Sequence, residues 1–250
     1  MSKKYEFTDE TIIVNGITLH RIKALIDFDR FGIKAGDLGG FIEVEANLSH
    51  DGNAWVYGDA LVYGNALVSE NAKVFPDALV YGNALVSGNA LVSGNALVSG
   101  NAKVSGNAKV SGNVWVSENA KVSGDALVYG NAKISENARV SGNACVSGDA
   151  WISGNAKISG DAWVSENAKI SGDAKIKRSN DYACVNGFGP VYKNTTFFRC
   201  EDDLIRAQCG WFYGTIDEFR AKVKETHGDS KYAKEYLMIA DLMEYHFAED

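Results

Sequence analysis

The chain has 250 residues, of which 46% are apolar, and a formal net charge of −7. Gly occurs 26 times and Pro only 2 times, a bias expected of a regularly repeated turn and not of a disordered tract. No segment is basic enough for general nucleic-acid binding, and no apolar run approaches the ~18 residues that span a bilayer. We therefore expect a folded protein with no membrane partner and no general affinity for nucleic acid.

The cysteines form no CxxC pair; they are Cys145, Cys184, Cys200 and Cys209. The first residues lead directly into polar Tyr5–Thr8, which does not resemble a signal peptide. We expect reduced thiols and a cytoplasmic location, because disulfides persist in oxidising compartments.

The first predicted element is a β-hairpin over residues 11–22, because Asn15-Gly16 suits a type I′ turn. Gly36–Glu43 then leads toward the repeats. An open stack of strands leaves unpaired backbone at its ends. We therefore interpret residues 1–45 as an N-terminal cap.

A six-residue repeat dominates the rest of the chain. A Val or Ile stands at position 56 and at every sixth position through 176, which gives 21 hexads without an insertion. Two positions earlier stands Ala, with Val114 the only exception. Side chains alternate along a strand, so both residues face one side, and Ser-Gly-Asn or Ser-Gly-Asp turns the corner. One hexad cannot bury its own apolar side, so the hexads must stack.

Read from the aliphatic position, Val-Ser-Gly-Asn-Ala-Lys resembles the hexapeptide repeat of left-handed parallel β-helix proteins. The resemblance implies a mainly β fold in which three hexads close a triangular coil of 18 residues. The 21 hexads then make about 7 coils within residues 46–177, a prism about 34 Å long at ~4.8 Å per rung. Only the family implies the left hand, since crossover connections are usually right-handed.

The family hosts acyltransferases, nucleotidyltransferase domains, γ-type carbonic anhydrases and ice-binding proteins, so the fold alone does not fix an activity. Its acyltransferases typically use a histidine base at a coil edge, its carbonic anhydrases bind zinc through three histidines, and its ice-binding proteins use outward Thr rows. The 21 hexads contain neither His nor Thr. We therefore predict no catalytic residue, no cofactor, no metal ligand and no enzymatic activity.

His50 is the one histidine at the first coil. Ala46-x-Leu48 looks like a first hexad, separated by a two-residue insertion from Ala54-x-Val56. We interpret His50 as a solvated residue of the cap, with a functional base as the alternative.

The remaining outward position of each hexad forms rows, because coils repeat every 18 residues. One set is apolar and is our candidate oligomer interface: Leu61, Leu79, Leu97, Trp115, Leu67 and Leu85. Monomers seldom expose such a patch, which favours a homotrimer, the assembly common in this family. The alternative is that residues 1–45 cover the patch or that the Leu side chains stack on one another.

A second set is basic and is our candidate face for an anionic partner: Lys103, Lys121, Arg139, Lys157 and Lys175. Like charges about 5 Å apart repel one another unless an anion lies along them. The alternative is a row of solvated charges that keeps the exposed strand edges from aggregating.

Residues 178–250 predict an α+β domain. Thr195–Arg199 and Leu204–Cys209 read as paired strands, and Thr215 with Glu218 forms a capping box for a helix that ends at Gly228. A second amphipathic helix is expected from Ser230 to about Phe247, with one face made of Tyr232, Tyr236, Ile239, Leu242 or Met243, and His246. Cys200, Cys209 and His227 could bind a metal together, but we favour ordinary core thiols.

Thr195–Arg199, Cys209–Phe219 and the lead-in Asp37–Glu43 resemble segments of uncharacterised phage and prophage proteins that also carry hexapeptide repeats. The resemblance implies a phage-encoded protein that acts in the cytoplasm of a bacterial host. Our prediction is a non-enzymatic, self-associating binding protein that sequesters a host defence protein or a nucleotide signal, and so a counter-defence protein. The alternatives are a virion structural component and a hexapeptide-type acyl or nucleotidyl transferase.

Overall fold

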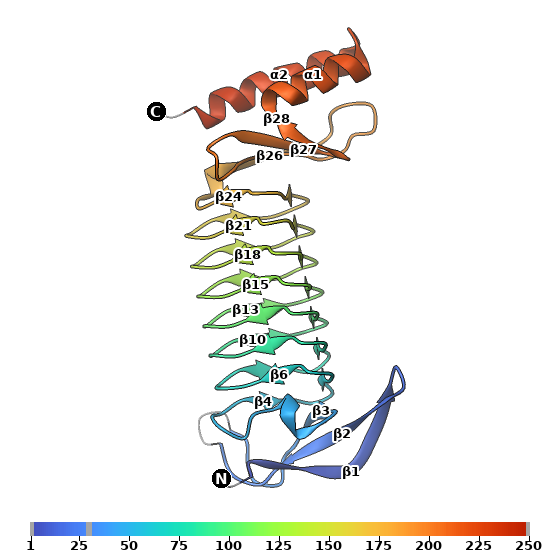
Figure 1. Ribbon diagram of the computed structural model, residues 1–250, viewed down its shortest axis with the longest axis vertical. Helices are drawn as coiled ribbons and strands as arrows, with labels where there is room; N and C mark the ends of the chain where they lie inside the picture. The colour runs from blue at the N-terminus through green and yellow to red at the C-terminus, as the bar shows by residue number, and fades with distance from the viewer. Residues whose placement is uncertain (1–2, 29–31, 249–250) are drawn as a thin grey trace.

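The structure is a computed structural model that describes residues 3–28 and 32–248. A β-solenoid forms the long middle part, a hairpin projects from its N-terminal end, and a small sheet with two helices covers its C-terminal end (Figure 1). The predicted fold class is confirmed: mainly β, with parallel sheets in the solenoid. The left hand of the coil stays a prediction from the resemblance.

Three parallel sheets make the sides of the solenoid. The first sheet consists of β4 (Trp55–Val56), β7 (Lys73–Val74), β10 (Leu91–Ser93), β13 (Lys109–Ser111), β16 (Leu127–Val128), β19 (Cys145–Val146) and β22 (Trp163–Val164). The second consists of β5 (Leu61–Val62), β8 (Leu79–Val80), β11 (Leu97–Val98), β14 (Trp115–Val116), β17 (Lys133–Ile134), β20 (Trp151–Ile152) and β23 (Lys169–Ile170), extended at one end by β3, β2 and β1. The third consists of β6 (Leu67–Val68), β9 (Leu85–Val86), β12 (Lys103–Val104), β15 (Lys121–Val122), β18 (Arg139–Val140), β21 (Lys157–Ile158) and β24 (Lys175–Ile176).

Neighbouring rungs are offset by one coil, as Leu97 opposite Trp115 illustrates. This register confirms that three hexads close a coil. The stack begins earlier than the 7 predicted coils, because β3 (Leu38–Ile42) pairs in parallel with β5 and Leu48 bridges to Val68. The solenoid therefore has about eight turns, the first of them incomplete.

The first turn differs from the others at its outward position. There the short 3-10 helix η2 (Glu45–Asn47) buries Asn47, whose amide nitrogen donates to the carbonyl oxygens of Gly64 and Ala66 at 2.9 and 2.8 Å. Leu48 is buried in the core, so the predicted first hexad is present. The extra residues between Leu48 and Ala54 form part of the following loop and do not disturb the stack.

One continuous core fills the solenoid. Every inward Ala, Val and Ile of the 21 hexads is buried, and the exceptional Val114 is buried as well. Because each rung contributes the same small set of side chains, burial is shared between neighbours and no single rung could be stable alone.

The corners explain the glycines of the repeat. Gly106 has φ +68°, and a Cβ atom there would lie 2.9 Å from both the backbone N and O of Gly124 in the next rung. Some corners use Glu in the same left-handed conformation, such as Glu70 with φ 59°. Its carboxylate accepts a hydrogen bond from the Gly88 amide at 2.8 Å, so the side chain offsets part of the backbone strain.

Asn side chains form ladders along the corners, each amide nitrogen donating to the oxygen of the residue one coil later. Asn101, for example, donates to Asn119 at 3.0 Å. Runs of such bonds end on an Asp, as Asn107 on Asp125 and Asn155 on Asp173. A carboxylate accepts but cannot donate, which is why Asp suits the C-terminal end of a run.

The N-terminal hairpin is longer than the predicted residues 11–22. It consists of β1 (Tyr5–Val14) and β2 (Ile17–Ala24), joined by Asn15 and Gly16, both with positive φ as a type I′ turn requires. β2 also pairs antiparallel with β3. The hairpin thus continues the second sheet of the solenoid.

The C-terminal sheet has four antiparallel strands in chain order: β25 (Tyr182–Val185), β26 (Thr195–Arg199), β27 (Ile205–Cys209) and β28 (Phe212–Thr215). The sequence predicted β26 and β27 but not the outer two. Alternate residues of β26 belong to different cores, because Phe198 packs into the solenoid interior and Phe197 packs against the helices. The sheet therefore caps the solenoid with one face and supports the helices with the other.

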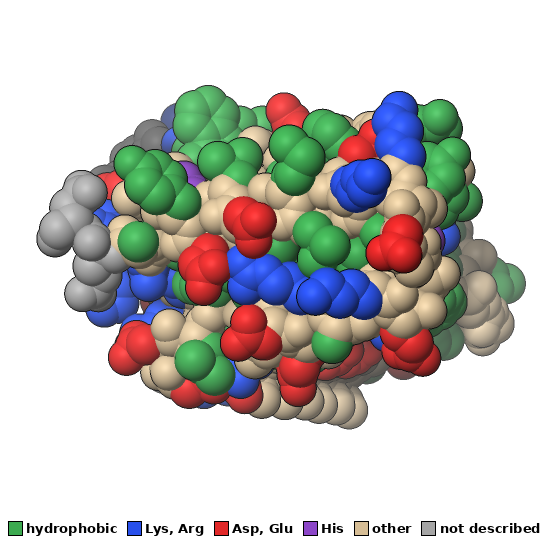
Figure 2. All heavy atoms as spheres, turned by 90° about the horizontal axis from the view of Figure 1, so that it is seen from above, with side chains coloured by type: hydrophobic (Ala, Val, Ile, Leu, Met, Phe, Trp, Pro, Cys, Tyr) green, Lys and Arg blue, Asp and Glu red, His purple; other side chains and the backbone are tan. Residues whose placement is uncertain are grey.

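The helices are α1 (Ile216–His227) and α2 (Lys231–Phe247), and the predicted capping box of α1 is present. Tyr236, Ile239 and Met243 face the core as expected. Tyr232 and His246 are exposed, and Phe247 is buried in their place. Seen from above, this end of the molecule mixes hydrophobic, acidic and basic side chains with no single-sign patch (Figure 2).

Candidate functional site

The five predicted cations form one row on the third sheet, which we call the basic row. Lys103 lies opposite Lys121, Lys121 opposite Arg139, and the alignment continues through Lys157 to Lys175. The first three side chains are exposed and the last two are half-buried. Adjacent rungs are ~4.8 Å apart, so the row concentrates positive charge along one side of the solenoid.

The C-terminal sheet meets the end of this row. The ammonium group of Lys157 forms a close ion pair with Glu201, which lies in the turn after β26. Lys175, one rung further, lines a groove of about 1220 Å³ between the solenoid end, the 3-10 helix η3 (Ser179–Asp181) and α2. We call this the C-terminal groove.

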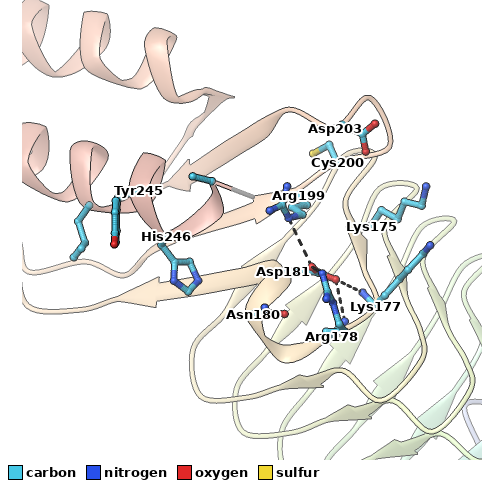
Figure 3. Close-up of a pocket in the computed structure, with 12 residues that line it drawn as sticks. Lys175, Lys177, Arg178, Asn180, Asp181, Arg199, Cys200, Asp203, Tyr245 and His246 are labelled. Carbon is cyan, nitrogen blue, oxygen red and sulfur yellow. Dashed lines mark hydrogen bonds and ion pairs between the residues drawn. The ribbon is translucent and has the colours of Figure 1, made fainter. Parts of the chain in front are cut away.

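Basic side chains dominate the charged lining of the C-terminal groove: Lys175, Lys177, Arg178 and Arg199 stand against Asp181 and Asp203. Tyr245 and His246 of α2 form the opposite wall. Lys175 and Lys177 extend in the same direction from adjacent backbone segments (Figure 3). Arg and Lys side chains arranged in this way favour phosphate or carboxylate groups.

Asp181 serves the turn more than the groove. Its carboxylate accepts hydrogen bonds from the backbone amides of Lys177 and Arg178 at 2.8 and 2.9 Å. The guanidinium groups of Arg178 and Arg199 lie 3.6 and 3.7 Å from the other oxygen. This buried carboxylate therefore fixes the loop that carries the two preceding cations.

Arg199 joins the solenoid end to α2. Its guanidinium donates to the carbonyl oxygen of Phe247 at 2.6 Å and lies 5.6 Å from the centre of that ring. Cys200, the next residue, is buried, and burial raises the pKa of its thiol. A thiol with a raised pKa is a poor nucleophile at neutral pH, so the groove is better suited to binding than to cysteine chemistry.

The predicted apolar interface is partly covered by the hairpin. Leu61 and Leu79 pack against a small cluster whose centre is Leu19, Phe41 and Tyr63. The other predicted leucines, Leu67, Leu85 and Leu97, are half-buried at the surface, and Trp115 is 49% exposed. The structure thus brings the six residues onto two adjacent sides, with the hairpin over the N-terminal part.

His50 lies inside the N-terminal cap. Its Nδ1 accepts a hydrogen bond from the Lys4 amide at 3.2 Å, and its ring stacks on Tyr5 with centroids 4.3 Å apart. Its Nε2 is buried without a hydrogen bond and lies 3.9 Å from a Glu45 oxygen. These contacts fit a packed residue better than a base at the surface, and they make it less solvated than the sequence suggests.

The possible metal ligands do not come together. Within residues 3–28 and 32–248, no group of three or more His, Cys, Asp or Glu side chains could hold a metal ion. The Cys209 thiol instead accepts a hydrogen bond from Thr195 at 3.1 Å, and His227 stacks on Tyr236.

Sequence reasoning missed the C-terminal groove as a site. Its cations come from the last rung, from η3 and from β26, and only the folded chain brings these segments together. The adjacent Lys177-Arg178 at the end of the basic row was the available signal. In the described part of the chain, no helix is long and apolar enough to cross a membrane.

Residues 54–70, 78–94 and 138–154 match the family model of the YdcK β-solenoid repeat. No curated protein matches the chain. One similar solved structure, of a Bacillus cereus protein provisionally described as an acetyltransferase, is 13% identical. The match covers 68% of this chain and 92% of that chain, with a TM-score of 0.23. The chain is a β-solenoid repeat protein, and so distant a neighbour says nothing about its activity.

Proposed function

We propose that this β-solenoid is a non-enzymatic binding protein that holds an anionic partner along the basic row and in the C-terminal groove. The observation that supports the proposal is the position of Lys175, which ends the basic row and lines the groove. The two features therefore form one continuous basic surface.

The row has an energetic reason to bind an anion. Side chains of like charge directly opposite one another in a sheet destabilise it. Glu201 relieves this repulsion at Lys157, which shows what a carboxylate does at this surface. A bound anion would do the same for Lys103, Lys121 and Arg139, whose side chains are exposed.

The groove suggests the size of the ligand. At about 1220 Å³ it is slightly larger than the ~300–1,000 Å³ typical of small-molecule sites, and it is open to the row. A nucleotide carrying several phosphates fits this chemistry. With the implied phage origin, the finer proposal is a counter-defence protein that sequesters a nucleotide signal of the host; an acidic host protein is the alternative partner.

Isothermal titration calorimetry with a cyclic dinucleotide, a nucleoside triphosphate and a poly-glutamate peptide tests the proposal. We expect Lys121→Glu with Arg139→Glu, and separately Lys177→Glu, to weaken binding about tenfold or more, because each removes a charge-assisted contact. Lys109→Glu with Lys133→Glu makes the same charge change on the other two sheets and is the matched control.

Three results would contradict the proposal: no binding of any of these probes, an equal loss in the control variant, or turnover of acetyl-CoA that disappears in His50→Ala. A preference for poly-glutamate over both nucleotides would assign the surface to an acidic protein.

We also propose that the solenoid self-associates as a trimer through its apolar rows. The half-buried Leu85 and Leu97 lie beyond the hairpin cluster, so Leu85→Glu with Leu97→Glu should yield monomers of 27.0 kDa by light scattering. Leu79→Glu is a poorer test, because Leu79 packs against the hairpin. A wild-type mass equal to the monomer's would contradict the trimer.

A further inference from the structure

Trp and Lys alternate along the C-terminal half of the second sheet. Trp115 lies opposite Lys133, Lys133 opposite Trp151, and Trp151 opposite Lys169. We call these four residues the Trp–Lys row. It lies on a different sheet from the basic row, so the two surfaces can be tested separately.

The indole rings of the Trp–Lys row are held in place yet remain accessible. The Nε1 atom of Trp151 donates to the hydroxyl of Ser135, one corner earlier, at 3.4 Å, and the ring is 47% exposed. The Lys133 ammonium lies 4.8 Å from the ring centre of Trp115, and that of Lys169 lies 5.9 Å from Trp151. Each aromatic platform therefore carries a positive charge beside it, without loss of ring exposure to the protein core.

A pocket of about 410 Å³ ends the row where the solenoid meets the C-terminal sheet. Trp151 and Lys169 line it from the solenoid, while Lys193 and Trp211 line it from the C-terminal region. Trp211 stands in the turn between β27 and β28 and is fully exposed. A large aromatic side chain in full contact with water is unfavourable unless a partner covers it.

Polar groups complete the same pocket. The Ser171 hydroxyl donates to the Gln208 side-chain oxygen at 3.0 Å, and the Gln208 nitrogen donates to the Gly210 carbonyl at 3.1 Å. Ser153 also lines the pocket. Flat aromatic faces beside hydroxyl and amide groups match a sugar ring, whose C–H face is apolar and whose edge carries hydroxyls.

We propose that the Trp–Lys row and its terminal pocket bind a linear acidic glycan in which charged and neutral sugars alternate. One Trp and one Lys recur every two rungs, about 9.6 Å at ~4.8 Å per rung. This length is close to a disaccharide unit in an extended chain. The neutral sugar stacks on the indole, and the carboxylate of its neighbour pairs with the lysine.

The charge pattern distinguishes a glycan from single-stranded nucleic acid. A nucleic acid carries a phosphate at every unit and binds to grooves with dense positive charge. The row offers one lysine every two rungs, in a protein whose net charge is −7. Sparse cations and regularly spaced rings therefore favour a polymer with one charge in two units. This inference does not depend on the proposed function.

Titration calorimetry with hyaluronan oligosaccharides, which alternate a uronic acid with a neutral sugar, tests the inference. Neutral cello-oligosaccharides, polygalacturonate and oligo(dT) serve as comparison probes. We expect hyaluronan to bind most tightly. Trp151→Ala and Trp211→Ala should each weaken binding about fivefold or more, because each removes a stacking platform. Lys169→Gln should weaken binding and reduce its dependence on salt.

Trp163→Ala is the matched control, because Trp163 is 56% exposed and is anchored on Ser147 in the same way, but it lies on the first sheet. Its affinity should equal that of the wild type. Trp151→Phe keeps an aromatic face and should retain most of the binding, which separates stacking from a folding defect. The inference is overturned if no acidic glycan binds, if Trp163→Ala weakens binding equally, or if oligo(dT) binds more tightly than hyaluronan.

Discussion

The two halves of the solenoid share one interior and differ on the outside. Inward positions such as Val80 and Val140 are equally buried. Outward positions differ, since the N-terminal half presents half-buried leucines such as Leu79, and the C-terminal half presents exposed residues such as Arg139. The repeat thus fixes the fold from within, while each outward position is free to carry a separate function.

Equal interiors should give equal costs of truncation. Val80→Ala and Val140→Ala each remove a fully buried side chain and leave a cavity between rungs. We expect each to lower the free energy of unfolding by about 2 kcal/mol, measured by urea denaturation. A difference between them of more than ~1 kcal/mol would show that the halves are not equivalent inside.

The outward positions beside those two residues serve as the contrast. Leu79→Ala should cost about 1 kcal/mol, because Leu79 packs against the hairpin cluster. Arg139→Ala should change stability by less than ~0.5 kcal/mol, since exposed substitutions are usually neutral. Equal effects at Leu79 and Arg139 would remove the distinction between the two outer surfaces.

A corner substitution tests whether the turns are as demanding as the interior. Gly106→Ala forces a side chain into φ +68° and against the backbone of Gly124. We expect a loss of about 1–3 kcal/mol in the same urea assay. Ser105→Ala, in the neighbouring position, is the control and should be nearly neutral. If Gly106→Ala were equally mild, the corners would be more adaptable than the stacking distances indicate.

The smallest expected effect is a pH dependence at the N-terminal cap. Burial lowers the pKa of Lys4 from 10.5 to about 8. Between these values the unfolded chain binds more protons than the folded chain, so stability should rise with pH from about 8. Burial also raises the pKa of Tyr5, which reverses the trend above pH ~10, where an unfolded tyrosine ionises.

Urea midpoints at two pH values within that window measure this effect. The wild type should be more stable at the higher pH, and Lys4→Met should flatten the difference, because its side chain has no proton to lose. Lys3→Met is the control, since Lys3 is exposed and paired with Glu45. Stability that falls with pH across the window would contradict a buried, charged Lys4.

The six-residue period by itself determined most of the fold. It predicted the coil length, the three sides and which side chains face inward, because a strand alternates its side chains and each hexad repeats the same alternation. It also placed the basic row correctly, since residues 18 apart must stack once the coil closes. The Asn15-Gly16 turn and the Thr215 cap were similarly local signals, which need no distant partner.

Only the tertiary structure decided what lies at the ends and what covers the outer rows. The hairpin over Leu61 and Leu79, the two-faced strand β26 and the C-terminal groove all join segments far apart in the chain. No periodicity reports such contacts, because their geometry depends on how separate elements dock. The sequence thus determined the solenoid through local repetition, whereas the sites arise where the repetition stops.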